Sequence, residues 1–373
     1  MPSQSALQGC LLGTAVGDAL GLACEGLSSA RQKRLFPDLN RFHFLPGGRG
    51  MVSDDTEHLC LVGQALLRSG GEPVAFQRAL AWQLRFWLLG LPAGIGLATL
   101  KGILKLCLGV SPERSGVFSA GNGPAMRATL LGVLFGAQPE KLKVLNRIST
   151  RLTHSDPKAE WGALAIALAA HQASHFAADS AADGGTISSP RLFLNQFRAL
   201  LPTPLPPEAQ ALLTFLEQAA DSAAAATEPA QQLAAFQQFL QELGCAQGIT
   251  GYMYHTVPAV LFVWFLQPKD VLTGLQMLIR AGGDTDTTAA LLGGILGAQV
   301  GPQGLPVDLL KNLWEWPRNT AWMAEMGQKL QPLAVRESPL PPLKLAVWQL
   351  PLRNFIFLQG VLFHGFRRLF PPY

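Results

Sequence analysis

The sequence predicts an all-α protein, and three observations support this prediction. Segments with the alternating apolar and polar residues of a half-buried strand are scarce. Ala, Leu and Gln are abundant, and apolar residues recur at helical spacing along most of the 373 residues. Charged residues make up only 14% of the chain and apolar residues 49%, whereas a typical domain has about 25% charged residues. The apolar excess has to be buried in a core, against a partner or in a membrane.

The first predicted helix, Leu7 to Glu25, is apolar and rich in small residues. Glycine recurs at every fourth position, which lets another helix approach closely: Gly9, Gly13, Gly17 and Gly21. The segment is apolar enough to imitate the hydrophobic region of a signal peptide, but no basic region precedes it and Asp18 interrupts it. We therefore expect a buried helix of a soluble protein.

A loop over residues 40–53 delivers Ser53 to the start of a second predicted helix. The acidic residues Asp54, Asp55 and Glu57 then occupy its first turn, where negative charge suits the positive end of the helix dipole. Taken alone, the Asp pair fits an N-terminal helix cap as well as a ligand set.

A third loop, 111–123, precedes a helix expected from Met126, and a further polar cluster runs from Asp284 to Thr288. Backbone N–H groups of the loop's last three residues could receive diphosphate or ribose oxygens at the positive helix end. Carboxylate and hydroxyl oxygens are ligands that magnesium and manganese prefer, so the 284–288 cluster and the Ser53 cluster would make one site if folding joined them. A capped turn is the structural alternative for the 284–288 cluster.

Asp284, Asp286 and Thr288 also match the nucleophile motif of haloacid-dehalogenase-like phosphatases. In that fold the first Asp ends an apolar parallel strand of an α/β domain. Here two glycines precede Asp284 and the flanks are helical, which argues against this interpretation. An EF-hand fails because the sixth position is not Gly and the twelfth is not Glu.

Cysteine and charge content narrow the class of protein. The five cysteines are far apart and form no Cys-x-x-Cys motif, so we expect reduced thiols in a cytoplasmic protein, without a zinc site. The net charge is +4 and no dense Lys/Arg run precedes the C-terminal segment, so nucleic-acid binding is not expected. Residues 249–267 are long and apolar enough to suggest a membrane span, but Pro258 and His255 favour a buried core helix.

Two segments depart from the rest in composition. Residues 172–245 are rich in Ala and Gln, are broken by Gly184-Gly185 and by prolines at 202–207, and predict a variable helical insert. Residues 327–373 form a tail of prolines followed by aromatic residues and arginines, which leaves 1–326 as the main domain. We expect the tail to pack on the bundle, with contact to a membrane surface or a partner as the alternative.

Five motifs in this order resemble the ADP-ribosylglycohydrolases, among them the dinitrogenase-reductase-activating glycohydrolase. They are Gly9 to Gly21 followed by Glu25, Ser53-Asp-Asp-Thr56, Gly121-Asn-Gly-Pro-Ala-Met-Arg127, Thr153-His154, and Gly282-Gly-Asp-Thr-Asp-Thr287. The resemblance covers about four-fifths of the chain and leaves out the tail and much of 172–245. It implies a compact orthogonal bundle of helices and a pair of magnesium ions, with manganese as an alternative, around which the distal ribose of ADP-ribose binds.

The resemblance also implies roles for individual residues. The implied metal ligands are Ser53, Asp54 and Asp55 from one side and Asp284, Asp286 and Thr287 from the other. The implied catalytic residues are Glu25, Asp55 and Asp284, and the implied substrate contacts are Gly121, Asn122, Gly123, Met126 and His154. Ser53 stands where the family usually has Thr, which keeps an oxygen ligand. Pro124 stands where many relatives have a small residue, which leaves the shape of its loop open.

Several of these residues also have a purely structural interpretation. Glu25 could be a surface residue at a helix end, and His154 could be a structural histidine. We expect Asp18 to be buried behind the ligands rather than to bind metal. Phe118 and Tyr252 could stack on adenine, although an aromatic residue in an apolar run usually belongs to the core.

The function implied by the resemblance is a magnesium-dependent hydrolase that cleaves the glycosidic or ester bond between ADP-ribose and an acceptor, such as an ADP-ribosylated protein. We expect a monomer in which water attacks the distal ribose, with Glu25 or a metal-binding aspartate as the base. The alternative is a non-catalytic ADP-ribose-binding or crystallin-like structural protein of the same fold. All four aspartates of the implied metal site are present, which favours the enzyme.

Overall fold

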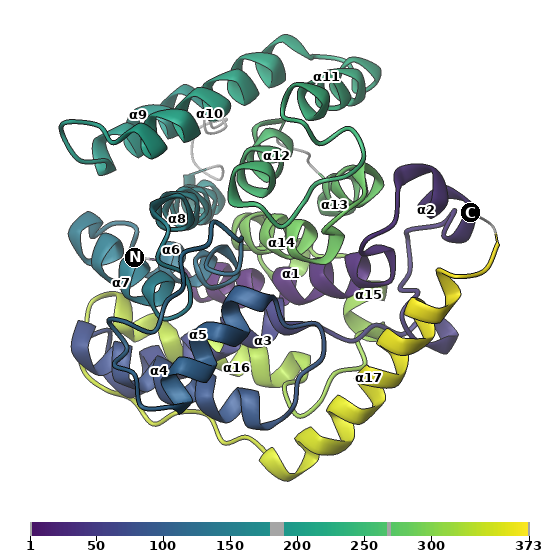
Figure 1. Cartoon of the computed structure of the whole chain (residues 1–373). Helices are drawn as coiled ribbons and strands as arrows, with labels where there is room; N and C mark the ends of the chain where they lie inside the picture. The colour runs from purple at the N-terminus through teal and green to yellow at the C-terminus, as the bar shows by residue number, and fades with distance from the viewer. Residues whose placement is uncertain (1, 180–189, 267–269, 372–373) are drawn as a thin grey trace.

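The structure, a computed structural model, describes residues 2–179, 190–266 and 270–371, and within these ranges it is all-α (Figure 1). The described residues contain 17 α-helices and no strand, with only isolated β-bridges between loops. The helices are α1 (Gln4–Gly21), α2 (Ser29–Leu35), α3 (Asp54–Ser69), α4 (Pro73–Leu89), α5 (Leu97–Cys107), α6 (Thr129–Phe135), α7 (Pro139–Arg151), α8 (Pro157–Asp179), α9 (Pro190–Leu200), α10 (Pro207–Ala225), α11 (Pro229–Glu242), α12 (Met253–Leu266), α13 (Val271–Ala281), α14 (Thr285–Val300), α15 (Val307–Asn312), α16 (Thr320–Leu330) and α17 (Leu350–Arg367). The predicted fold class is confirmed.

Two helices, α1 and α14, lie side by side through the middle of the molecule (Figure 1). A Cβ added to Gly9, Gly13 or Gly17 would come within 2.0 to 2.1 Å of a backbone oxygen of α14. The contacts run in opposite directions along the two helices, from Gly9 near Gly297 to Gly21 near Thr285. The predicted close approach is therefore confirmed, and it brings the end of α1 to the start of α14.

The core surrounds this pair. Helix α12 is buried along most of its length, so the apolar run described up to Leu266 is a core helix, as predicted, and Gln267 lies outside the described residues. In the described ranges, only the segment Gln4–Cys24, formed by α1 and the turn after it, is long and apolar enough to cross a membrane, and 94% of its apolar window is buried inside the fold.

Helices α9, α10 and α11 form an outer layer at the top of Figure 1. They lie within the segment predicted as a variable helical insert, and the expected break at Gly184-Gly185 lies outside the described residues.

The C-terminal segment lies on the side of the molecule opposite α9, α10 and α11 (Figure 1). Helix α16 runs across position 326, so the division between a domain and a tail stays a prediction. Helix α17 lies along the lower edge in Figure 1 and ends near α2. Phe357, on its inner face, packs with Leu22, Phe44 and Met51 in a small second core. The inner face of the tail therefore packs on the bundle, as expected.

Candidate metal and ligand site

The first turn of α3 is held by a buried carboxylate of α1. Ser53 caps the helix by accepting a hydrogen bond from the Asp55 N–H at 3.2 Å. Asp18 accepts from the backbone N–H groups of Ser53 and Thr56 at 3.0 and 3.1 Å, and from the Thr56 hydroxyl at 2.6 Å. Asp18 is fully buried. It therefore fixes the turn that carries the Asp pair, and its own oxygens are taken up by these donors.

The two acidic clusters, far apart in sequence, meet at this turn. The Thr287 hydroxyl of α14 donates to Asp55 Oδ2 at 3.1 Å. Asn122 donates from Nδ2 to Asp284 Oδ2 at 2.6 Å and to the Thr256 hydroxyl at 3.0 Å. The packing of α1 against α14 explains this meeting, because it brings the start of α14 next to the segment that follows α1.

The clusters border a cavity of about 670 Å³. Ten of the residues singled out from the sequence line it: Glu25, Asp54, Gly121, Asn122, Gly123, Met126, His154, Asp284, Asp286 and Thr287. Ser53 and Asp55 are buried and reach the lining through their hydrogen bonds. Phe118 and Tyr252 are outside the lining; Phe118 is 81% exposed, and the Tyr252 ring packs edge-on against His255. Neither residue is placed to stack on a ligand inside the cavity.

The buried carboxylates of this site raise one another's pKa values. Burial first, and then the charges of Asp18 and Glu57, raise the pKa of Asp54 well above its ordinary value. Burial and the neighbouring Asp18, Asp54 and Asp284 do the same for the pKa of Asp55. Burial and Glu25, Asp284 and Asp55 raise the pKa of Asp286. Such carboxylates do not all ionise together unless a cation is near.

Two oxygens of this set are buried and have no hydrogen-bond partner: Asp55 Oδ1 and Asp286 Oδ1. A buried polar atom of a folded protein is nearly always satisfied by protein, water or an ion. Hard carboxylate and hydroxyl oxygens are the donor set of Mg²⁺ and Mn²⁺. The residues present therefore fit a divalent cation.

The carboxylates are not arranged around a single point. Within the described ranges, no three His, Cys, Asp or Glu side chains are grouped closely enough to hold an ion by themselves. Hydroxyl and amide donors instead occupy one oxygen of Asp55 and one of Asp284. The hydroxyl oxygens of Ser53 and Thr287, each 3.1 Å from Asp55 Oδ2, are further oxygen donors beside these carboxylates.

His154 forms one wall of the cavity and is held in a neutral state. Burial, followed by the charge of Arg127, lowers the pKa of His154 to about 3. Arg127 donates to the Thr153 hydroxyl at 2.7 Å, and that hydroxyl lies 2.9 Å from His154 Nδ1. Since the Thr153 oxygen accepts from Arg127, its own proton is available for Nδ1, and this assigns the imidazole proton to Nε2. The Nε2 atom would come within 3.1 Å of a Cβ added at Gly121, so the glycine allows the ring to lie there.

The loop at 111–123 and the segment that follows it differ from the prediction. The helix expected from Met126 is a 3-10 turn at Ala125–Arg127, and α6 begins only at Thr129. The Asn122 N–H donates to the Gly251 carbonyl at 2.9 Å and is not free for a phosphate. Backbone pairing with residues 251–253 keeps this loop extended and delays the helix. The helix N-termini that do border the cavity are those of α3, α5 and α14.

Glu25 lies at the rim of the cavity and is exposed to solvent. Burial of the carboxyl group by surrounding atoms and the charge of Asp284 raise its pKa, and Arg368 partly offsets this. The Arg368 guanidinium donates to the Glu25 carbonyl, which ties the end of the tail to the rim. No sequence pattern predicted that the tail would reach this point.

A buried network of charges lies behind the Asp pair. Glu57 pairs with Arg318 at 2.8 Å and accepts from Trp87 at 2.6 Å. Arg353 of α17 pairs with Glu315 at 2.8 Å and donates to the Val52 carbonyl at 2.6 Å. Sequence reasoning missed this network because its members are spread from residue 52 to 353 without a motif.

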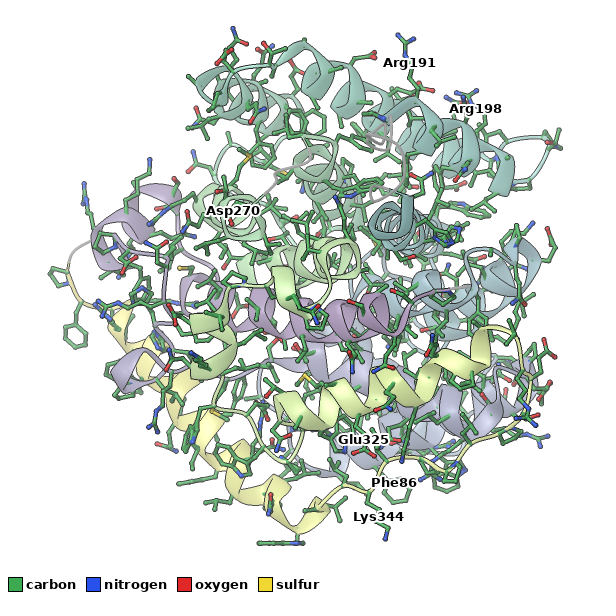
Figure 2. The ribbon with its side chains drawn as sticks, turned by 180° about the vertical axis from the view of Figure 1, so that it is seen from behind. Phe86, Arg191, Arg198, Asp270, Glu325 and Lys344 are labelled. Carbon is green, nitrogen blue, oxygen red and sulfur yellow. The ribbon has the colours of Figure 1, made fainter. Side chains whose placement is uncertain are left out.

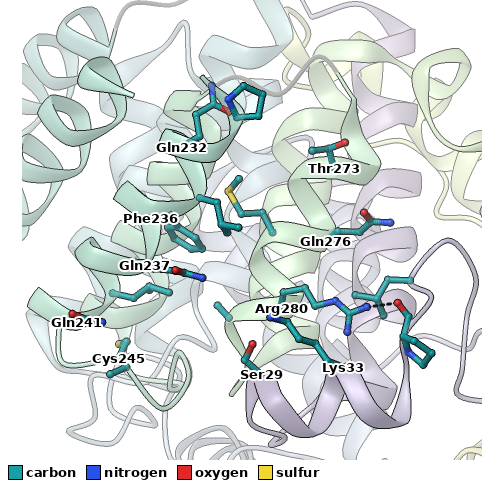
Figure 3. Close-up of a pocket in the computed structure, with 18 of the residues that line it drawn as sticks. Ser29, Lys33, Gln232, Phe236, Gln237, Gln241, Cys245, Thr273, Gln276 and Arg280 are labelled. Atoms are coloured by element: carbon teal, nitrogen blue, oxygen red, sulfur yellow. Dashed lines mark hydrogen bonds between the residues drawn. The ribbon is translucent and has the colours of Figure 1, made fainter. Parts of the chain in front are cut away.

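A larger cavity of about 850 Å³ lies between α2, α11 and α13 (Figure 3). Lys33, Arg280 and several glutamines line it, and Arg280 donates to the Pro37 carbonyl at 2.8 Å. It contains none of the residues predicted for metal or substrate binding.

Comparison with known proteins points to one family. The sequence profile of the family described as ADP-ribosylglycohydrolase matches residues 2–339. An uncharacterized protein of Archaeoglobus fulgidus is 36% identical over 165 residues, which are 43% of this chain and 53% of that protein. The ADP-ribosyl-[dinitrogen reductase] glycohydrolase of Rhodospirillum rubrum is 24% identical and the ADP-ribosylhydrolase ARH3 of Danio rerio 27% identical; the matches cover 82% of this chain and 89% and 85% of those proteins. A solved structure described as an ADP-ribosylglycohydrolase-related protein complex has a TM-score of 0.64 at 24% identity, over 89% of this chain and 99% of that one, and shares its fold.

Proposed function

Because the chain belongs to the ADP-ribosylglycohydrolase family and is a hydrolase of that kind, we propose that it releases ADP-ribose from an acceptor in a magnesium-dependent reaction. The observation that carries the metal part of this proposal is the pair of buried carboxylate oxygens without partners, Asp55 Oδ1 and Asp286 Oδ1. They come from two clusters that meet only in the folded protein. The proposed substrate is an ADP-ribosylated protein, in line with the names of the relatives.

The proposed ligands are Ser53, Asp54 and Asp55 on α3 and Asp284, Asp286 and Thr287 at the start of α14. When bound, two Mg²⁺ ions would polarise the oxygens of the distal ribose and of water and stabilise charge that develops during the reaction. Asp18 keeps the α3 ligands in place through its hydrogen bonds to Ser53 and Thr56. Asn122 orients Asp284 in the same way.

The chain's own groups account for the proton transfers and for orientation of the substrate. Glu25, with its raised pKa and its place at the rim, takes a proton from the attacking water. The new bond joins the water oxygen to the anomeric carbon of the distal ribose, the bond from that carbon to the acceptor breaks, and Glu25 returns the proton to the acceptor. His154 donates from Nε2 to a ligand oxygen, since Nδ1 faces Thr153.

The test is release of free ADP-ribose from arginine-linked, serine-linked and nucleic-acid-end conjugates, with and without magnesium. Asp55→Asn and Asp286→Asn should each remove most magnesium-dependent turnover. The double variant should cost little more than either single change, because residues that act through one site are strongly non-additive.

A matched control is His154→Ala, which should slow turnover while leaving the magnesium requirement unchanged. If Asp286→Asn kept full activity with the parent's magnesium requirement, while Asp55→Asn was inactive, the shared site would be wrong. Asp286 would then belong to a structural turn only.

A further inference from the structure

Helix α17 buries polar as well as apolar residues and exposes many large apolar ones. Its fully buried residues include Arg353 and His364, which hydrogen-bond to Glu315 and to the Phe44 carbonyl. Its solvent side carries large apolar residues at helical spacing: Trp348 just before the helix, then Leu352, Phe355, Leu358, Leu362, Phe363 and Phe366. A surface helix in water normally buries its apolar face and exposes its polar one. The exposed face of α17 is therefore suited to contact something other than water.

The apolar surface extends beyond the helix. Asn354 of α17 donates to the Gly90 carbonyl at 2.6 Å, which places the turn after α4 beside the helix. Leu89 and Leu91, on either side of Gly90, are 71% and 83% exposed. Figure 2 shows Phe86 of α4 and Lys344 toward one edge of the molecule, with Glu325 beside them. A soluble monomer rarely exposes so many neighbouring apolar side chains unless the surface binds a partner or a membrane.

Within the C-terminal segment that carries this surface, the charged residues have one sign. Residues 338–373 contain no Asp or Glu, but they contain Lys344, Arg353, Arg367 and Arg368. Arg353 is buried, whereas Lys344 lies exposed before the helix and Arg367 lies exposed at its end. Basic residues at both ends of an apolar, aromatic-rich face complement a surface of anionic lipid headgroups.

We propose that the outward face of α17, together with residues 89–91, docks on the surface of a lipid bilayer that contains anionic lipids. Aromatic side chains such as Trp348 and Phe355 suit the boundary between headgroups and acyl chains. The helix lies on the membrane instead of crossing it, because its inner face is committed to the bundle through Arg353 and Phe357.

Co-sedimentation of the full-length protein with vesicles tests this proposal. The protein should bind vesicles of phosphatidylcholine with phosphatidylglycerol more tightly than vesicles of phosphatidylcholine alone, and added salt should weaken the difference. The variant with Trp348→Ser, Phe355→Ser, Phe363→Ser and Phe366→Ser should bind about tenfold more weakly or worse. Each of Lys344→Gln and Arg367→Gln should weaken binding to anionic vesicles by about fivefold.

The control variant carries Leu192→Ser and Leu233→Ser, two exposed residues on α9 and α11 across the molecule (Figure 1). It should bind vesicles as the parent does. The four side chains changed to serine on and just before α17 are at least 59% exposed, so the melting temperature should stay close to that of the parent.

Two outcomes would overturn the proposal. One is absence of vesicle binding by the parent, or equal binding by the serine variant of α17. The other is a concentration-dependent dimer of the parent in analytical ultracentrifugation that is absent in the serine variant, together with no binding of the parent to vesicles. The face would then be an interface between two copies of the chain.

Discussion

Replacing Arg353 by Met should destabilise the protein and also disturb the proposed metal site. The guanidinium is fully buried between Glu315 and Glu57, with nitrogen to oxygen distances of 2.8 and 3.5 Å, and it donates to the Val52 carbonyl at 2.6 Å. Met keeps a side chain of similar length without the charge. Glu315 then loses the cation to which it is paired, whereas Glu57 keeps Arg318.

Removal of one partner from a buried ion pair costs about 3–5 kcal/mol, because the other charge stays buried without compensation. With an unfolding entropy of about 2.1 cal/mol/K per residue, the same loss lowers the melting temperature of a chain of this length by about 4–6 °C. Val52 directly precedes Ser53, so loss of its hydrogen bond should also weaken magnesium binding. The rise in melting temperature on addition of magnesium should therefore be smaller in the Arg353→Met variant than in the parent.

The loss of stability should depend on pH with a definite sign. Arg353 and Arg318 outweigh the effect of burial and hold the pKa of Glu57 below its ordinary value, so this pairing stabilises the fold above that value and is lost as pH falls. Burial raises the pKa of Glu315 despite Arg353, so this carboxyl takes up a proton first on acidification. The difference in stability between parent and Arg353→Met should be largest at neutral pH and shrink as the pH falls.

Denaturant unfolding of a double-mutant cycle measures this effect. The cycle contains Arg353→Met, Glu315→Gln and the double variant, since Gln can still accept from the Val52 N–H. The double variant should recover part of the stability that Arg353→Met loses. A loss of unfolding free energy below about 1 kcal/mol that does not change with pH would refute the reasoning, because a buried carboxylate without a partner destabilises the fold by more than this.

Two further predictions concern the metal site and the central helix pair. The raised pKa values of Asp55 and Asp286 mean that the metal-free protein loses stability as pH rises above the ordinary aspartate range, so the increase in melting temperature on adding magnesium should grow with pH. Asp55→Asn should melt higher than the parent without magnesium and should lose most of that increase; a full increase in the variant would contradict the site. Gly17→Ala should cost about 1–3 kcal/mol, because its Cβ would lie 2.0 Å from the Ala289 carbonyl oxygen. The control is Gly365→Ala in α17, where a Cβ meets nothing within 4 Å; it should be neutral or stabilising by up to about 1 kcal/mol. If Gly17→Ala and Gly365→Ala changed the stability in urea unfolding equally, the approach of α1 to α14 would not be tight.

The helical fold and the pairing of α1 with another helix were predictable because both depend on local patterns. Helical spacing of apolar residues indicates the buried face of a helix. Glycine at every fourth position indicates that another helix approaches closely, but does not identify that helix. The convergence of the Ser53 and Asp284 clusters was inferred from ligand chemistry and from the resemblance, since neither segment specifies the other.

What sequence reasoning missed depends on contacts between distant, unremarkable residues. The tail was expected to pack on the bundle, but its sequence did not single out Arg353. This arginine is buried because one turn of α17 faces Glu315 and Val52. The start of α6 was misplaced for a similar reason. Backbone pairing of Asn122 with Gly251 is a tertiary contact that no propensity reports.

Two kinds of carboxylate share the first turn of α3, and their partners separate their roles. Glu57 is paired with arginine, which holds its pKa low and makes it part of the scaffold. Asp54 and Asp55 lie three and two residues away, without an arginine partner among the described contacts, and the pKa of each is raised. Arginine behind the turn thus neutralises the structural acid and leaves the acids near the cavity uncompensated. A divalent cation on the cavity side would supply the missing charge, which is why the same turn can be stable as a scaffold and reactive as a ligand set.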